Sequence, residues 1–163
     1  MIAAKIIANL EGLDSLVNRF PEVSREVRES KISEALLLLE AAVKEKTPQG
    51  AGPIHLRDTI FPKVQAYGEK VEGILGTPQV HGEPVELGTK PHFPPVEPIR
   101  FWVERVLGIQ GKEAKGVAFL IARAISKRGT EGAKMFEEGF EENRDQVTRI
   151  LEGIADEIVR RVS

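Results

Sequence analysis

Chemistry in this chain of 163 residues would have to come from its three histidines and the carboxylates near them. His81, Glu83, Glu86 and His92 are close in sequence and could together supply nitrogen and oxygen ligands to a metal ion. Their spacing is not that of H-E-x-x-H or of another familiar helical pair. His55 and the other two histidines lack the sequence context of a Ser-His-Asp triad, and the chain has no cysteine. The sequence therefore predicts no catalytic residue, no cofactor and no metal site, with a small metal-dependent enzyme as an alternative.

Two further patterns that resemble catalytic motifs have simpler explanations. The pairs Glu137-Glu138 and Glu141-Glu142 could suggest acid-base chemistry, but on an amphipathic helix they indicate a solvated face. Gly50-Ala51-Gly52 is followed by Pro53 rather than by Gly-Lys-Ser, so no phosphate-binding loop is indicated.

The charge of the chain argues against a dedicated nucleic-acid-binding protein. The formal net charge is −2, whereas such proteins usually carry a basic excess. Arg123, Lys127, Arg128 and Lys134 form one basic cluster, which could touch a phosphate backbone if many copies lined a channel. Cations near a helix C-terminus are also explained by the helix dipole alone. No apolar run approaches the ~20 residues of a membrane span, and no signal peptide is recognisable, so we expect a soluble protein made in a cytoplasm.

The elements that must position these residues surround a connector from Gly76 to Pro98. It contains six of the ten prolines, so it can be neither a long helix nor a central strand. Before it, the alternation of apolar residues over 60–76, with Gly68-Glu69-Lys70 as a turn, predicts a β-hairpin. Residues 1–10 fit either a short strand or the start of a helix, and we expect the strand, which would widen this hairpin into a small sheet.

Helical periods dominate the rest of the chain. A short helix is expected before Pro21 and a long one from Pro21 to about Lys46. Four successive leucines, Leu36 to Leu39, span the circumference of that helix and predict cover on more than one side, from the same domain or from another subunit. Beyond the connector, helices are expected to end at Gly108 and Gly129. A last helical segment, about 131–162, is either broken at Gly139 or Asn143 or projects towards a partner helix.

These expectations define an α+β fold in a single domain over residues 1–163. A small antiparallel sheet built on the hairpin at about 60–76 packs against the long N-terminal helix and the C-terminal helices.

The order of three sequence pieces resembles a family of phage proteins. Thr47-Pro48-x-Gly50 is followed by Leu56-Arg57-Asp58-Thr59-Ile60, then by the hairpin ending at Gly76-Thr77, and then by Val85-Glu86-Leu87-Gly88-Thr89 with a proline-rich run after it. This order, over about residues 10–160, resembles the neck, tail-completion or head-to-tail joining (minor tail) proteins of long-tailed lambdoid-type bacteriophages and prophages. The chain departs from that pattern at His81 and Pro84, where the family has aromatic residues.

The resemblance implies an α+β virion protein without catalytic activity, which assembles as a ring between portal connector and tail tube. Its expected partners are further copies of itself and the neighbouring connector and tail-terminator or tail-tube proteins, with no membrane and no specific nucleic acid, although DNA could pass through the ring. Its expected location is the virion, and the host cytoplasm during assembly. A cytoplasmic adaptor that binds another protein through the C-terminal helix is a further alternative. The candidate interface residues are Leu36, Leu37, Leu38, Leu39, Glu86, Gly88, Thr89, Pro91, Phe140, Ile154 and Ile158.

Overall fold

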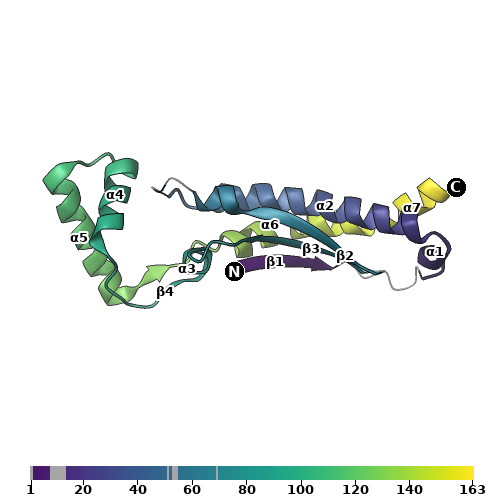
Figure 1. Ribbon diagram of the computed structural model, residues 1–163, viewed down its shortest axis with the longest axis horizontal. Coiled ribbons are helices and arrows are strands. Elements are labelled where there is room, and N and C mark those ends of the chain that lie inside the picture. Colours follow the sequence, from purple (N-terminus) through teal and green to yellow (C-terminus); the bar gives the residue numbers. More distant parts are fainter. Residues whose placement is uncertain (1, 8–13, 51, 53–54, 69) are drawn as a thin grey trace.

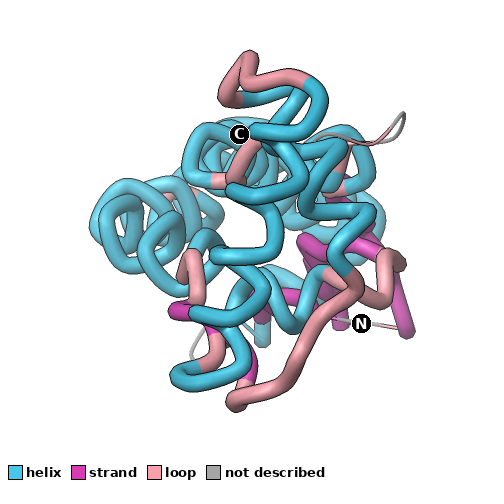
Figure 2. Tube along the Cα trace, turned by 90° about the vertical axis from the view of Figure 1, so that its left-hand side faces the viewer, coloured by secondary structure: helices cyan, strands magenta, loops and turns pink. Residues whose placement is uncertain are grey.

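The structure, a computed structural model, is elongated, with a helical hairpin at one end and the C-terminus at the other (Figure 1). It describes residues 2–7, 14–50, 52, 55–68 and 70–163. The main body is a small antiparallel sheet packed on long helices, so the predicted α+β fold is confirmed. Figure 2, seen from the hairpin end, shows the strands gathered on one side of the helices.

Helix α2 (Pro21–Lys46) is the central element of the main body. It begins with Pro21, whose fixed φ suits the first turn, and has Lys44 and Lys46 in its last turn, where the dipole favours cations. Thr47 ends it, and its hydroxyl donates a hydrogen bond to the carbonyl of Val43 at 2.7 Å. The predicted long helix is confirmed with the same bounds. The short helix expected before it is α1 (Asp14–Arg19).

The sheet consists of β1 (Ile2–Ile7), β2 (Phe61–Tyr67) and β3 (Lys70–Thr77), in the order β1-β3-β2 with antiparallel neighbours. Gly68 turns the hairpin with a φ of 60°. One face of the sheet lies on α2 so closely that a Cβ on Gly73 would come within 2.9 Å of Leu36. The hairpin and the N-terminal strand are thus confirmed, and α2 supplies the core that a lone hairpin lacks.

The terminal segment lies along α2 and does not project. It forms α6 (Met135–Glu152) and α7 (Ile154–Val162), separated at Gly153. The break expected at Gly139 or Asn143 was wrong. Gly139 instead allows close packing, because a Cβ there would come 2.9 Å from a methyl group of Val43, and Asn143 bonds back to the Gly139 carbonyl at 2.9 Å.

The connector from Gly76 to Pro98 contains a short helix, α3 (Gly82–Leu87), which the sequence did not predict. It leads into β4 (Gly88–Thr89), which pairs with β5 (Thr130–Glu131) to form a two-stranded ribbon. Between these strands the chain forms the hairpin of α4 (Val96–Val106) and α5 (Gly111–Arg128) at the end of the molecule (Figure 1). A 3-10 turn, Leu56–Thr59, precedes β2.

The apolar core is divided in a way that follows this shape. The largest cluster joins α2, the sheet and α6, and a second one joins Val27 to Ile154 and Ile158 of α7. The α4–α5 hairpin has a cluster of its own around Val103, Ala114 and Ala118. The single-domain prediction stays a prediction, because the hairpin has its own apolar cluster.

Candidate functional site

Glu86 links the connector to the first turn of α6. It lies on α3 and is 4% exposed, and its two carboxylate oxygens accept hydrogen bonds from the backbone N–H groups of Phe136 and Glu137, each at 3.0 Å. These N–H groups belong to the first turn of α6, where no carbonyl of the helix can reach them and where the dipole favours an anion. Glu86 is therefore the N-terminal cap of α6, supplied from another element.

Backbone contacts strengthen the same junction. The N–H of Ala133 donates to the Val85 carbonyl at 2.7 Å, and that of Lys134 donates to the Glu86 carbonyl at 3.1 Å. Lys134 has a left-handed φ of 50°, which turns the chain into α6. A side chain on Gly132 would overlap the Glu86 carbonyl. We call the contacts of Val85 and Glu86 with residues 132–137 the clasp.

Glycines allow the ribbon beside the clasp to close. Gly88 has a φ of 78°, and a Cβ there would overlap the Thr130 carbonyl. Gly129, with a φ of 74°, would likewise overlap the Thr89 carbonyl. The hydroxyls of Thr89 and Thr130 are hydrogen-bonded at 2.9 Å. The ribbon thus fixes both ends of the helical hairpin together.

This geometry corrects the role expected for Glu86. Glu86 was expected at a contact with another protein, but its carboxylate is buried and hydrogen-bonded within the chain. Gly88 and Thr89 also serve the internal ribbon, whereas Pro91 is exposed after it. Glu86, Gly88 and Thr89 therefore make their contacts within the chain.

The apolar interface candidates divide into buried and exposed residues. Leu36, Leu39, Ile154 and Ile158 are at most 1% exposed and lie in the cores described above, so they are unavailable to a partner. Leu38 and Phe140 are partly buried against the same core. Of these candidates Leu37 is the exposed one, at 59%. The four-leucine turn is covered by the chain's own sheet and α6, which is one of the two outcomes that the sequence left open.

The histidines and their neighbouring carboxylates do not converge. His81 and His92 are exposed, and His92 Nδ1 lies 2.9 Å from the Lys90 carbonyl, while the Glu86 carboxylate faces α6. Over the part of the chain that the structure describes, no three His, Asp or Glu side chains form a group that could hold a metal ion.

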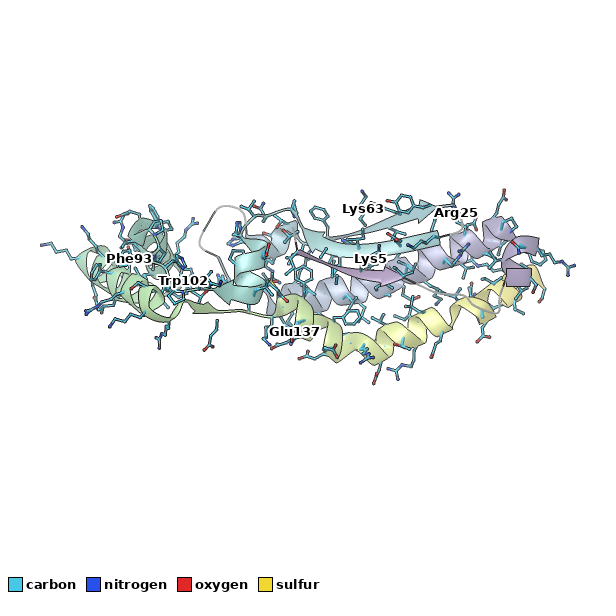
Figure 3. The ribbon with its side chains drawn as sticks, turned by 90° about the horizontal axis from the view of Figure 1, so that it is seen from below. Lys5, Arg25, Lys63, Phe93, Trp102 and Glu137 are labelled. Atoms are coloured by element: carbon cyan, nitrogen blue, oxygen red, sulfur yellow. The ribbon has the colours of Figure 1, made fainter. Side chains whose placement is uncertain are left out.

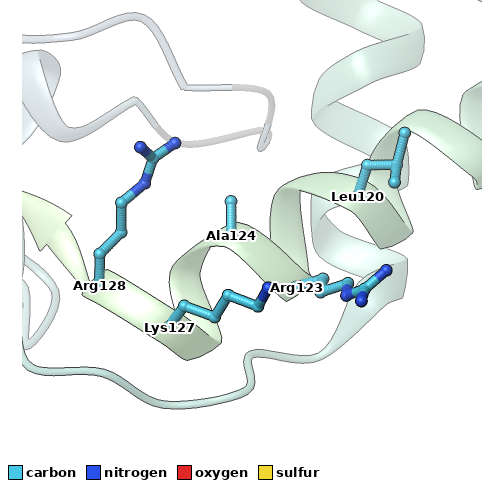
Figure 4. A pocket seen from close by; sticks show the side chains of 5 residues that line it. All are labelled: Leu120, Arg123, Ala124, Lys127 and Arg128. Carbon is cyan, nitrogen blue, oxygen red and sulfur yellow. The ribbon is translucent and has the colours of Figure 1, made fainter.

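Helix α5 of the hairpin carries exposed apolar and basic side chains. Phe119 and Leu120 of α5 are 49% and 62% exposed, and Phe93 packs on Phe119 with 6.2 Å between ring centroids. A shallow concavity of about 450 Å³ beside Leu120 is lined by Ala124 and three cations, Arg123, Lys127 and Arg128 (Figure 4). Figure 3 shows Phe93 and Trp102 at this end of the molecule, and the Trp102 indole donates to the Gln49 carbonyl at 3.4 Å.

A groove of about 480 Å³ lies between α2 and α6. Its apolar part comes from Leu38, Ala41 and Ala42, and its polar rim from Glu45, Lys46, Glu142 and Asn143. Lys46 Nζ lies 2.7 Å from Glu142 and 3.5 Å from Glu138. The hydrogen bond to Glu142 raises the pKa of the Lys46 ammonium above its ordinary value.

The outer face of the sheet carries an ion triad. Glu72 on β3 lies 2.6 Å from Lys70 and 2.9 Å from Lys5, whose position on the sheet Figure 3 shows. The hydrogen bonds from Lys70 and then Lys5 lower the pKa of the Glu72 carboxyl below its ordinary value. Beside the triad, a small hollow of about 130 Å³ is lined by Phe61, Lys63, Ile74, Gly76, Thr77 and Pro78.

Comparisons with protein-family models, with curated proteins and with solved structures found no match to this chain. Among the described residues, no helix combines the length and the apolar character that crossing a membrane requires. Any inference about function therefore depends on the contacts and surfaces described above.

Neither the clasp nor the α2–α6 groove was predicted from the sequence. The clasp joins residues 50 and 51 positions apart, and no local pattern marks a glutamate as the cap of a distant helix. The groove had a partial signal, since Leu38 and Ala42 lie one turn apart on a helix that also carries Glu45.

Proposed function

We propose that this chain is a non-enzymatic structural protein of a tailed phage or prophage particle. It joins or completes the head-tail interface by ring-type oligomerisation and protein-protein docking. The motif order of residues 47–95, described above, supports the choice of this class of particle. The proposed partners are further copies of the chain and the neighbouring connector and tail-terminator or tail-tube proteins, in the virion and in the host cytoplasm during assembly.

The feature that best supports an assembly role is the α4–α5 hairpin at the end of the molecule (Figure 1). It packs one helix face inward on Val103, Ala114 and Ala118, yet Phe101, Phe119 and Leu120 stay about half exposed or more on the other sides. Apolar side chains grouped on a small projecting element are typical of a surface that a neighbouring subunit covers.

No specific observation favours either alternative function, the adaptor or the metal-dependent enzyme. An adaptor that binds through the C-terminal helix would need the apolar face of α7, but Ile154 and Ile158 of that face are buried against Val27. A metal-dependent enzyme would need His81, Glu83, Glu86 and His92 to converge, and the described side chains do not.

Deletion of the coding sequence from the phage or prophage that carries it tests the proposal. We expect heads and tails that fail to join, or unfinished tails, in electron micrographs of the lysate, and restoration by the wild-type gene in trans. A variant with Phe119→Ser and Leu120→Ser should complement poorly, whereas Glu83→Gln, an exposed change on α3, should complement fully. Intact, infectious particles from the deletion strain would contradict the proposed function.

A further inference from the structure

Helix α5 of the hairpin carries five cations that have no acidic partner among the residues that the structure describes. Lys112, Lys115, Arg123, Lys127 and Arg128 make no ion pair with any residue that the structure describes. From Gly88 to Gly129 the sequence has eight lysines and arginines against three glutamates, although the whole chain has 23 basic and 25 acidic residues. The hairpin is therefore basic and the main body acidic.

The exposed side of α5 mixes these charges with apolar groups in helical register. Phe119, Arg123 and Lys127 are spaced four residues apart and so follow one row along the helix, with Leu120 beside them. Leu120 and Ala124 line the concavity together with Arg123, Lys127 and Arg128 (Figure 4). We call Phe119, Leu120, Arg123 and Lys127 the tip stripe.

The groove between α2 and α6 has the complementary character. Leu38, Ala41 and Ala42 offer an apolar floor, and Glu45 and Glu142 stand on its rim. The neighbouring first half of α6 is acidic and exposed, as Figure 3 shows for Glu137. Lys46 compensates Glu138 and Glu142 within the chain, but Glu45, Glu141 and Asp145 have no ion pair with another described residue.

We infer that the tip stripe of one copy docks in the α2–α6 groove of a second copy. Leu120 and Phe119 cover the apolar floor, while Arg123 and Lys127 approach Glu45 and Glu142 on the rim. This contact deepens, and rests on, the proposed assembly function. A nucleic acid would use the cations but leave Phe119 and Leu120 in water, whereas the groove matches both parts of the stripe.

The contact joins two different surfaces, so it is heterologous. The pair keeps one free stripe at one end and one free groove at the other, and repetition gives a closed ring or an open filament according to the rotation between copies. Such a contact between small, charged surfaces should be weak for a single pair and sensitive to salt, and closure of a ring would add the stability of simultaneous contacts.

Sedimentation velocity on the full chain tests this contact. We expect the wild-type protein to self-associate with a dissociation constant of about 10–100 µM in about 50 mM NaCl, and at least ~10-fold more weakly in about 500 mM NaCl. Arg123→Glu/Lys127→Glu and, separately, Glu45→Lys/Glu142→Lys should each weaken self-association by ~10-fold or more. Circular dichroism and urea unfolding confirm that each variant is folded.

Matched controls place the same charge changes elsewhere. Lys112→Glu/Lys115→Glu lies at the other end of α5, and Glu152→Lys/Asp156→Lys lies on exposed positions of α6 and α7 outside the groove. Each control should change the dissociation constant by less than ~3-fold, because long-range effects of exposed charges are largely screened.

Mixing the variants tests the heterologous geometry. The stripe variant retains a native groove and the groove variant retains a native stripe, and the reversed stripe of the first also attracts the reversed groove of the second, so an equimolar mixture should associate although each variant alone does not. The variant that carries all four substitutions should regain self-association, because the reversed charges again attract. A wild-type protein that stays monomeric at about 500 µM in low salt would overturn the inference, and so would stripe and groove variants that associate like the wild type.

A labelled 30-base-pair DNA duplex provides the competing test by fluorescence anisotropy. If Arg123→Glu/Lys127→Glu abolishes duplex binding but leaves self-association unchanged, the stripe is a nucleic-acid surface and the inference falls. Failure of this inference can be distinguished from failure of the proposed function. Loss of particle joining on gene deletion would keep that function even if the stripe variants assemble normally, and self-association through the stripe would stand even if particles form without the gene.

Discussion

The carboxylate of Glu86 accepts a hydrogen bond from the backbone N–H of Phe136 at 3.0 Å, and its second oxygen accepts one from the N–H of Glu137. Through this side chain the connector determines where the last long helix begins. The β4–β5 ribbon, two residues further on, determines where the helical hairpin leaves the body. The clasp and the β4–β5 ribbon thus connect the basic hairpin to the part of the molecule that carries the α2–α6 groove.

Glu86→Gln should lower the free energy of unfolding by about 1–2 kcal/mol. The amide retains one oxygen acceptor, so one of the two N–H groups at the start of α6 loses its partner, and the interaction of a charge with the helix dipole is lost as well. Urea unfolding followed by circular dichroism at 222 nm measures the change. Glu86→Ala should cost more.

Glu83→Gln is the control for this change, since Glu83 lies on the same short helix but is exposed. Its free energy of unfolding should stay within ~0.5 kcal/mol of the wild type. Equal stability of the Glu86→Gln and Glu83→Gln proteins would show that Glu86 does not cap α6.

Elements with strong local patterns could be predicted from the sequence. Pro21 and the apolar period up to Val43 define α2, and the alternation around Val64 and Val71 with Gly68 between them defines the hairpin. These signals are local, because side chains one helical turn or two strand positions apart share a face. The third strand and the covering helix were also expected, since a lone hairpin is marginal, but which hairpin strand the third one pairs with was not predicted.

The clasp and the path of the last helices could not be predicted in the same way. Helix α3 spans six residues and contains Pro84, so neither length nor composition marks it as helical. Glu86 looked like a surface contact because its donors lie 50 residues away and belong to a helix end. The apolar face of α7 looked unpartnered because its partner, Val27, lies on the opposite end of the chain. Each miss concerns a tertiary contact that has no local pattern.

Gly129→Ala should destabilise the β4–β5 ribbon. The residue has a φ of 74°, and a Cβ would overlap the Thr89 carbonyl, so either the strand pairing opens or the backbone shifts. We expect a loss of ~1–3 kcal/mol in the free energy of unfolding and faster cleavage by trypsin near Arg128.

Gly116→Ala is the matched control. Gly116 lies inside α5 with nothing within 4 Å of an added Cβ, so the substitution should stabilise the helix by ~0.5–1 kcal/mol. If Gly129→Ala and Gly116→Ala have the same effect on stability and on proteolysis, the close approach at the ribbon does not constrain the hairpin.

Leu36→Ala and Leu37→Ala should differ strongly although the residues are adjacent. Leu36 is fully buried between α2 and β3, whereas Leu37 is 59% exposed. The first substitution leaves a cavity and should cost ~2–5 kcal/mol, and the second should cost ~0.5 kcal/mol or less. Thermal and urea unfolding of both variants measure the difference. Similar losses would mean that the four-leucine turn is covered from outside as well as by the chain's own core.

The ion triad of Glu72 should make part of the stability depend on pH. Lys70 and Lys5 hold the pKa of the folded Glu72 carboxyl below its ordinary value of 4.5. A carboxyl whose pKa is lower in the folded state contributes stability that is fully present above its unfolded pKa and is lost as the pH falls through the folded pKa. The wild type should therefore exceed Glu72→Gln in stability at neutral pH, and the difference should shrink as the pH falls below about 5.

Urea midpoints of both proteins at about pH 7, 5, 4 and 3 measure this difference in stability. Glu157, whose pKa is also lowered by its arginines, titrates in both proteins, so its contribution cancels from the difference. Added NaCl should reduce the neutral-pH difference, because one partner of each pair is about half exposed. A difference between the two proteins that stays constant from neutral to acid pH would show that the Glu72 triad does not contribute to stability through its charge.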